Sequence, residues 1–520
     1  MSNALPILAS VKSDWKAITE SPILGKDVLE LLSSSMYVNP LSIYREYVQN
    51  ATDSIEEAVA IGLLPSSAEG RIEIRIDPRE RRIRIRDNGV ALRHSEFVKR
   101  LVALGASRKR GMKARGFRGV GRLAGLGYCQ ELIFRSRADG EREVSELRWD
   151  CRKLKAVLRD SQFSDQLGEL ISQIVRVRRG VDTTLPDRFF EVELVGLIRH
   201  GSDLLMNAEV VCRYLSEVAP VPFSPEFQYR QEIEAMLANH ISLGNVGIFV
   251  NGASGPIYRP HRDSFSVRKG VLDSFTHFTP IELSNADGRL AAVGWVLHHG
   301  YSGAISSEAA IAGLRLRCGN IQIGENDLLD ELFQEPRFNG WAVGEIHIID
   351  DRILPNGRRD HFEQSVHFND LLNQLAPTAN DLSRQCRASS IQRNAIREYE
   401  RQRESVNEML AVMKQGAVSS EKILILESDV KRGIAVLQKL CENRIKDADL
   451  ARLLAHKTKR VKQRADQIFA RRIHAPALKQ RAPREKAIYE SLFGLIYECS
   501  PDQKMARELV DRLLKRLIQK

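Results

Sequence analysis

Hydrophobic residues recur at helical spacing early in the chain and then change to strict alternation. Apolar side chains at Ile43, Tyr47, Val48, Ala51, Ile55 and Val59 predict a helix over residues 40–60, after a shorter one over residues 28–34. In RIEIRIDPRERRIRIRDNG, residues 71–89, isoleucines alternate with charged residues on both sides of Asp77-Pro78, which predicts a β-hairpin with one buried face. Further strands are predicted at 131–136 and 189–194 and a helical stretch at 203–217, so this first unit is expected to be α+β.

The pattern changes twice more toward the C-terminus. Prolines at 220, 222 and 225 predict a boundary, followed by an α/β unit with strands at 247–250, 291–298 and 344–349. From about residue 380 the pattern is helical, and Tyr399, Val406 and Met413, seven residues apart, are a weak sign of a coiled coil. The two prolines of residues 474–486 predict a linker before a last amphipathic helix. The expected parts are an arm (1–24), a first domain (25–225), a second α/β domain (240–375), a helical region that is basic and a candidate coiled coil (380–473) and a helical end (487–520).

Composition narrows the class of protein. Of 520 residues, 43% are hydrophobic and 28% charged, which is typical of a globular chain. The absence of an apolar run of about 18 residues argues against a membrane span, and the N-terminus lacks the basic region of a signal peptide. The seven cysteines lie far apart without any CxxC pair, so neither a disulfide framework nor a zinc site is expected. A cytoplasmic location fits these features best.

The positive charge is concentrated in the last part of the chain. Residues 381–520 contain 31 Lys and Arg against 18 Asp and Glu, a net charge of +13, whereas the whole chain carries +11. Such a region can attract nucleic acid or an acidic partner, and a solvated helix face is the plainer interpretation. The stretch 451–490 has 12 basic and 3 acidic residues; its main cations are Lys457, Lys459, Arg460, Lys462, Arg464, Arg471 and Arg472.

The first candidate site residues lie in YREYVQNATDSI, residues 44–55. Glu46, Asn50 and Asp53 occupy positions i, i+4 and i+7, so they share one face of the predicted helix. Polar groups on a partly buried face need partners, and a divalent cation with a phosphate and a water would supply them. An amide oxygen suits Mg²⁺, and a carboxylate beside it can take a proton from water. Taken alone, the segment is better explained as a solvated helix face.

Two later segments add features that suit a nucleotide. In IRDNGVAL, residues 85–92, Asp87 ends a strand and can accept a hydrogen bond from an exocyclic amine, while Gly89 permits close approach of the backbone. In GFRGVGRLAGLG, residues 116–127, Gly116, Gly119 and Gly121 allow successive N–H groups to face one anion. The first segment is also ordinary turn chemistry, and the second could be a surface loop without the Walker A ending.

In this order and at this spacing, the three segments resemble the sequence boxes of the GHKL ATPases, which include the ATPase subunit of DNA gyrase, ninety-kilodalton heat-shock chaperones, histidine kinases, MutL and MORC proteins. The resemblance implies a Bergerat-type α/β sandwich that binds ATP and Mg²⁺. It implies that Glu46 is the general base, which favours a hydrolase over a kinase, and that Asn50 is the magnesium ligand. The remaining implied nucleotide contacts are Asp53 lining the pocket, Asp87 and Gly89 at adenine, Gly116, Gly119 and Gly121 at the phosphates, and Lys109 or Arg108 from a lid over 90–116.

One residue departs from the family pattern. Ala91 stands where a second glycine is usual, and alanine resists positive φ, so an altered lid or slower turnover is expected if the turn needs that conformation.

The second α/β unit resembles the ribosomal-protein-like transducer domain of chaperone, MutL and gyrase-type members. PNGRRDHFE, residues 355–363, is similar to their arginine-bearing loop, which implies that Arg359, or else Arg358, reaches the terminal phosphate. A salt bridge of Arg359 with Asp360 or Glu363 is the plainer alternative.

The resemblance also implies a working cycle and a choice of partners. Relatives of this kind act as ATP-gated dimers, so a homodimer is expected, with residues 1–24 and the helical region as candidate contacts. The first hypothesis for the client is nucleic acid, as in MORC or MutL proteins, in bacterial DNA maintenance or antiphage defence. The others are a chaperone-like protein clamp and a scaffold that binds nucleotide without hydrolysing it. Protein partners remain open, and no membrane partner is expected.

Overall fold

The structure is a computed structural model, and it describes residues 39–103, 121–160, 167–199, 201–267, 270–471 and 475–518. The chain divides into two compact units. The first comprises the chain up to His299 together with Ala304–Asn380, and the second comprises Gly300–Gly303 and the chain from Asp381 onward. The predicted N-terminal arm and the helix over residues 28–34 lie outside the described residues.

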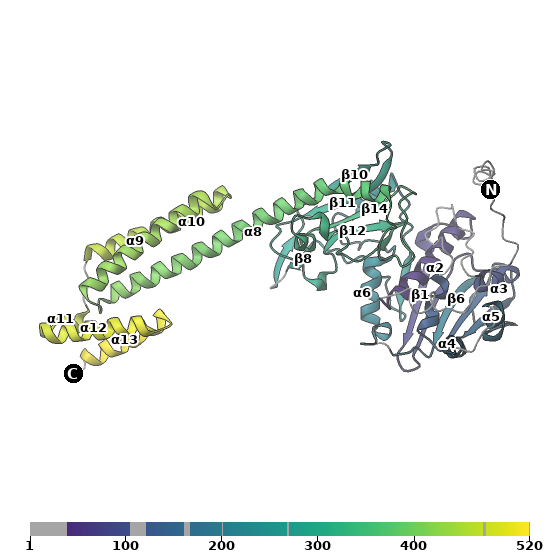
Figure 1. Cartoon of the computed structure of the whole chain (residues 1–520), viewed down its shortest axis with the longest axis horizontal. Helices are drawn as coiled ribbons and strands as arrows, with labels where there is room; N and C mark the ends of the chain where they lie inside the picture. The colour runs from purple at the N-terminus through teal and green to yellow at the C-terminus, as the bar shows by residue number, and fades with distance from the viewer. Residues whose placement is uncertain are drawn as a thin grey trace, which may run out of the picture. The chain divides into compact units, whose positions relative to one another are not determined.

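A seven-stranded sheet forms the first layer of the first unit, with strand order β5-β4-β3-β6-β2-β1-β7. Helices α2 and α6 pack against each other beside this sheet (Figure 1). The strands are β1 (Arg71–Asp77), β2 (Arg82–Asp87), β3 (Glu131–Arg137), β4 (Glu143–Asp150), β5 (Val175–Val181), β6 (Phe189–Val195) and β7 (Gly247–Val250). The helices are α2 (Ser42–Ala60), α3 (His94–Val102), α4 (Cys151–Arg159), α5 (Leu167–Ile174), α6 (Ala208–Val218) and α7 (Arg230–Ala238), with 3-10 turns η2 (Ser67–Glu69), η3 (Gly121–Gly127) and η4 (Leu204–Met206).

The predicted hairpin is confirmed. Strands β1 and β2 pair antiparallel with Ile74 opposite Ile85, and their isoleucines are buried on one face. The Asp77 carboxylate closes the turn by accepting hydrogen bonds from the backbone N–H groups of Arg79 and Glu80 at 2.9 and 3.0 Å. Because Asp side chains form such turns readily, the Asp-Pro break ends one strand and starts the next.

A second, five-stranded sheet has the order β10-β11-β14-β12-β13, and β8 pairs with β9 in a separate ribbon. Here β12 and β14 run parallel, while the other neighbours run antiparallel. The strands are β8 (Ser264–Val267), β9 (Val271–Ser274), β10 (His277–Ser284), β11 (Leu290–His298), β12 (Gly313–Cys318), β13 (Ile321–Ile323) and β14 (Val343–Ile348), with 3-10 turns η5 (Ser307–Ala309), η6 (Asp330–Leu332) and η7 (Pro336–Trp341).

The strand over residues 247–250 was assigned to the wrong sheet by the sequence pattern. The strand itself exists as β7, but it pairs parallel with β1 and forms an edge of the first sheet. The chain therefore returns to the first sheet after the prolines at 220–225, and those prolines do not end the first layer. The N–H of Val246 donates to Pro220 O at 3.2 Å, which guides this return.

The second unit is helical, as expected. Its helices are α8 (Val366–Gln415), of which the part after Asn380 belongs to this unit, α9 (Ser420–Asn443), α10 (Ala448–Arg471), α11 (Pro476–Lys479), α12 (Pro483–Cys499) and α13 (Gln503–Ile518). In Figure 1, α9 and α10 run beside each other. The linker predicted over residues 474–486 is wrong in part: Pro476 and Pro483 begin α11 and α12. Proline suits the first helical turn, where its missing N–H has no partner to lose.

The heptad residues of α8 pack inside their own chain. Tyr399 and Val406 are fully buried, and Met413 is nearly so. Val406 and Met413 share a core with α9 and α10, and the Tyr399 hydroxyl donates to Leu454 O at 2.9 Å. The heptad spacing thus describes helix packing within one unit and is no sign of a seam between chains. The fold class is confirmed as α+β with a helical C-terminal region, whereas the domain limits taken from the sequence remain predictions.

Candidate functional site

Helix α2 carries the first group of predicted residues. Its apolar face is buried in the core of the first unit through residues such as Tyr44, Val48 and Ile55. Glu46 and Asp53 are also buried, each only 6% exposed, while Asn50 is partly exposed. A buried carboxylate is costly without compensation, so the elements packed against this face of α2 decide what it can do.

Gly121, the last glycine of the predicted phosphate loop, lies directly against Glu46. A methyl group built on Gly121 would overlap Oε2 of Glu46, so only a glycine allows η3 to approach this closely. Tyr47, the next residue of α2, fixes the approach: its hydroxyl donates to Arg122 O at 3.2 Å and accepts from the Gly125 N–H at 3.0 Å. Lys109, Gly116 and Gly119 lie outside the described residues, so their predicted contacts stay predictions.

The segment predicted to bind adenine packs against the same helix two turns further on. Asp87 ends β2 and is buried, and its Oδ1 accepts a hydrogen bond from the Gly89 N–H at 2.9 Å. A side chain on Gly89 would collide with backbone atoms of Ser54 and Ile55, which explains the glycine. Burial raises the pKa of Asp87 to about 7, although the hydrogen bonds from Gly89 and Ser54 oppose the rise. A buried carboxyl group with few donors suits an incoming amine.

Ala91 adopts the conformation that its residue type disfavours. Its φ is +63°, in the left-handed region, and the residue is buried. The turn after Asp87 therefore does need positive φ at this position, as the glycine of the family pattern implies. Ser136 holds the next residue through its hydroxyl, which accepts from the Leu92 N–H at 2.8 Å.

Arg359 reaches the same face of α2 from the arginine loop, which runs between Pro355 and Phe362. Its Nε lies 3.6 Å from Oε1 of Glu46, and its Nη1 donates to the Gln49 side chain. The ion pair recorded for Arg359 is thus with Glu46, whereas Asp360 accepts a hydrogen bond from Asn356. The structure brings together Glu46 and Arg359, which the sequence places more than three hundred residues apart.

Two residues of this site were missed by the sequence analysis. Arg45 donates from Nη2 to Arg358 O at 2.9 Å and from Nη1 to Arg359 O at 3.4 Å, so it binds the arginine loop to α2. Gln49 is 1% exposed and accepts from Arg359. Their spacing of i and i+4 on a helix with few exposed positions was the available signal, because buried polar side chains at that spacing need a common partner.

Oε1 of Glu46 has the surroundings that a proton acceptor needs. It is buried and accepts no hydrogen bond from any residue within the described ranges. Arg45 and Arg359 approach it at 3.9 and 3.6 Å, which is near enough for charge attraction and too far for a hydrogen bond. A water molecule in the site could therefore donate to this oxygen.

The described residues offer oxygen ligands for one hard cation and no His or Cys site. Across the described parts of the chain, no group of three or more His, Cys, Asp or Glu side chains is placed to hold a metal. The Asn50 amide oxygen, next to Glu46 and Asp53 on α2, fits Mg²⁺, which typically takes one or two protein ligands and completes its shell with phosphate and water. His261 lies in the core of the first unit near Phe223 and Trp295, and burial lowers its pKa to about 3.

Comparison with known proteins gives the class to which these features belong. Residues 41–169 match the family described as "Histidine kinase-, DNA gyrase B-, and HSP90-like ATPase". The chain therefore contains an ATPase domain of the GHKL superfamily, whose members bind ATP, normally with Mg²⁺.

Among individual proteins, the chain is similar to two bacterial proteins named chaperone protein HtpG. The one from Cupriavidus metallidurans is 27% identical over 201 residues, and the one from Polaromonas naphthalenivorans is 25% identical over 200 residues. Each match covers 34% of this chain and 30% of the relative. The chain thus spans about a third of the length of these relatives, and the likeness concerns that part alone. None of the helices in the described part of the chain is long and apolar enough to cross a membrane.

Proposed function

We propose that this protein binds ATP with Mg²⁺ on the face of α2 and hydrolyses it, with Glu46 as the general base. The observation that carries the proposal is the position of Glu46: a buried carboxylate with an oxygen free of hydrogen bonds, packed on a loop glycine and approached by Arg359. Water attacks the γ-phosphorus and gives its proton to Glu46. The bond from phosphorus to the bridging oxygen breaks, and ADP and phosphate leave.

The other residues have supporting roles in this proposal. Asp87 accepts the adenine amine, Gly89 leaves room for the base, and Asp53 lines the pocket. Asn50 holds Mg²⁺, which neutralises phosphate charge when bound. The loop glycines, ending in Gly121, present N–H groups to the phosphates, and Lys109 approaches from the lid.

Arg359 has a place near the transferred phosphoryl group in this proposal. A guanidinium beside that group stabilises the charge that develops as the bond breaks. Its ion pair with Glu46 in the structure keeps the guanidinium close to where the phosphate would lie, since the base and the phosphate share the attacking water.

Steady-state ATP turnover of the wild type against Glu46→Ala tests the assignment. We expect turnover to fall by about 10²- to 10⁴-fold in the variant, the usual contribution of a general base. Binding of ADP should be preserved, because the base contributes little to ground-state affinity. Turnover that survives in Glu46→Ala would refute the role of Glu46. Absence of turnover in the wild type, with nucleotide still bound, would favour a nucleotide-gated scaffold.

The client is a separate proposal. Similarity to proteins named as chaperones favours an ATP-driven clamp on protein, and this fits an ATP-gated dimer. The clamp predicts that a non-hydrolysable ATP analogue doubles the mass of the particle in light scattering at micromolar concentration. A mass that does not change with nucleotide contradicts nucleotide-gated dimerisation.

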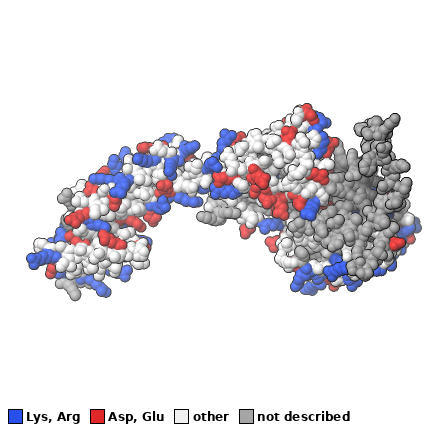
Figure 2. Space-filling view, viewed as in Figure 1, with Lys and Arg blue, Asp and Glu red and all other residues white. Residues whose placement is uncertain are grey.

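A second candidate client is nucleic acid, and one surface favours it. Helix α10 buries Leu454, Val461 and Ile468 and exposes cations along the rest of its surface. Figure 2 shows Lys and Arg side chains on the surface of the helical unit, with Asp and Glu side chains among them. Exposed cations bind the phosphate backbone without sequence preference, and their binding weakens steeply with salt. The exposed cations that lie closest together in the sequence of α10 are Lys459, Arg460, Lys462 and Arg464.

Duplex binding measured across a salt series separates these clients. Nucleic-acid binding predicts an affinity that falls linearly in a logarithmic plot against salt, with a smaller slope after Lys459→Ala and Lys462→Ala together. Binding that is absent at low salt would leave the protein clamp as the surviving hypothesis.

A further inference from the structure

The main chain of Arg359 is held on two sides. Its φ is +57°, an uncommon conformation for a residue with a side chain, so the surroundings must impose it. On one side Arg45 of α2 donates to Arg358 O and Arg359 O. On the other side the N–H of Gly324 donates to Arg359 O at 2.9 Å. The second anchor belongs to the turn that follows β13, and the proposed function does not yet use it.

Gly324 can form this contact because it is a glycine in a tight turn. Its φ is +70°, and a Cβ there would lie 2.9 Å from Asp360 O, the residue after Arg359. The turn is held in place by Gln322, whose Nε2 donates to Gly324 O at 3.1 Å. Gln322 therefore holds Gly324 in place, and Gly324 in turn holds the main chain of Arg359.

Gln322 is in turn joined to α6. Nη1 of Arg315, on β12, donates to Gln322 Oε1 at 3.2 Å and to Glu217 Oε2 of α6 at 2.9 Å. Arg315 and Gln322 are buried, with 4% and 3% of their surface exposed. The bond between Arg315 and Gln322 is buried in a medium of low dielectric constant, where charged and amide groups interact more strongly than in water. The bond to Glu217 is partly exposed.

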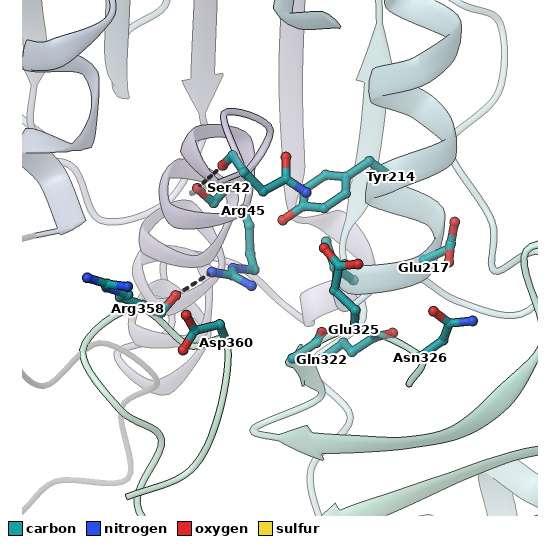
Figure 3. A pocket seen from close by; sticks show the side chains of 12 residues that line it. Ser42, Arg45, Tyr214, Glu217, Gln322, Glu325, Asn326, Arg358 and Asp360 are labelled. Carbon is teal, nitrogen blue, oxygen red and sulfur yellow. Dashed lines mark hydrogen bonds between the residues drawn. The ribbon is translucent and has the colours of Figure 1, made fainter. Parts of the chain in front are cut away.

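Four members of these contacts, Arg45, Glu217, Gln322 and Gly324, line a cavity of about 440 Å³. Figure 3 shows Glu217 and Tyr214 of α6, Gln322 and the arginine loop on its walls, with Arg45 reaching across toward Arg358. Two routes therefore join the α2 and α6 layer to the arginine loop, one through Arg45 and one through Arg315 and Gln322. Because α6 packs on α2, a shift of either helix acts on both routes.

We propose that Gln322, held by Arg315 and Glu217, is a positioning residue that sets the place of the Arg359 guanidinium beside Glu46. The proposal rests on the proposed function, since it assigns Arg359 a role in the reaction. Gln322 acts on Arg359 through the main chain of Gly324. Replacing Gln322 alone leaves an Arg315 N–H and the Gly324 carbonyl without this partner, which also lowers stability, so the test must separate position from stability.

The test compares Gln322→Met with Arg315→Met and with the control Arg337→Met, which removes an exposed arginine paired with Glu335. We expect the turnover number to fall about tenfold in the first two variants, with KM and ADP affinity within twofold of wild type, and no change in the control. The turnover number should fall while KM stays unchanged, because Gln322 and Arg315 position a group that acts in the transition state. Equal turnover numbers in wild type and Gln322→Met would overturn the proposal.

Two further measurements separate positioning from a general loss of structure. In an Arg359→Ala background, Gln322→Met should cause no additional loss of turnover, because the residue that it positions is gone. Gln322→Glu keeps the acceptor for Arg315 and loses the donor to Gly324, so it should lose turnover while remaining folded. A further tenfold loss on the Arg359→Ala background would mean that Gln322 acts through stability alone.

Amide hydrogen exchange distinguishes failure of this proposal from failure of the proposed function. Exchange across residues 355–362 should rise in Gln322→Met whether or not the protein hydrolyses ATP. Unchanged exchange in these residues would overturn the positioning role of Gln322 even if turnover confirms the ATPase. Faster exchange in a protein without turnover would uphold the anchoring of the loop and refute the role of Arg359 in hydrolysis.

Discussion

A single methyl group at Gly121 should separate folding from catalysis. The Cβ of an alanine would overlap Oε2 of Glu46, and ordinary contact needs about 3.5 Å or more, so the carboxylate must move by roughly an ångström. The atom in the way is the end of a flexible side chain, so the cost to folding should be small, about 1 kcal/mol. A displacement of this size in a catalytic group lowers the rate by up to about 10²-fold. We therefore expect turnover in Gly121→Ala to fall by that factor while the melting temperature changes by only about 2–4 °C.

The assay is a double-mutant cycle with Glu46→Gln, which removes the base and nearly preserves its shape. If the methyl acts by displacing Glu46, then Gly121→Ala should cause no further loss of turnover in the Glu46→Gln background. ADP binding by calorimetry controls for damage to the phosphate loop itself. Independent, multiplicative losses in the double variant, or a single variant with normal turnover, would refute the geometry argued for Glu46 and Gly121.

Two other predictions concern a titrating group and the helical unit. Adenine donates to ionised Asp87, so binding releases a proton from a carboxyl group whose pKa is raised to about 7. ADP affinity should therefore increase as pH rises from 6 to 7, by at most about tenfold per pH unit, and level off above pH 7. Calorimetry on Asp87→Asn should show no such pH dependence. An affinity that falls over this interval would contradict the assignment of Asp87. Tyr399→Phe removes buried bonds to Leu454 O and the Thr458 hydroxyl, so urea unfolding of the helical unit should lose about 1–2 kcal/mol, and an unchanged midpoint would show that these bonds contribute nothing.

Much of the first unit was predictable because its local patterns agree with its tertiary packing. The apolar spacing of residues 40–60 predicts the buried face of α2, and the alternating isoleucines predict the β1–β2 hairpin. The order of the three polar segments indicates the superfamily. The roles of Glu46, Asn50 and Asp87 remain proposals, but their helix and strand positions follow directly from periodicity.

Long-range pairing was the part that periodicity could not supply. Strand β7 has only the four residues Gly247–Val250 and pairs parallel with β1 from far along the chain. Its sequence fits either sheet, so nothing local selects the first. The heptad of α8 has a related limit: spacing identifies a buried face and not the identity of what buries it, here α9 and α10 of the same chain.

Helix α2 explains why so few residues can define this site. Along one helix, Glu46 meets Gly121, Gln49 meets Arg359, and Ser54 meets Gly89. Each contact lies about one helical turn from the next, so three segments from distant parts of the chain dock on consecutive turns. The packing of α2 in the core of the first unit therefore sets the distances among Glu46, Gly121 and Arg359. A change in how α2 packs must then alter all three contacts together, so in the proposed function this helix couples the nucleotide site to the arginine loop.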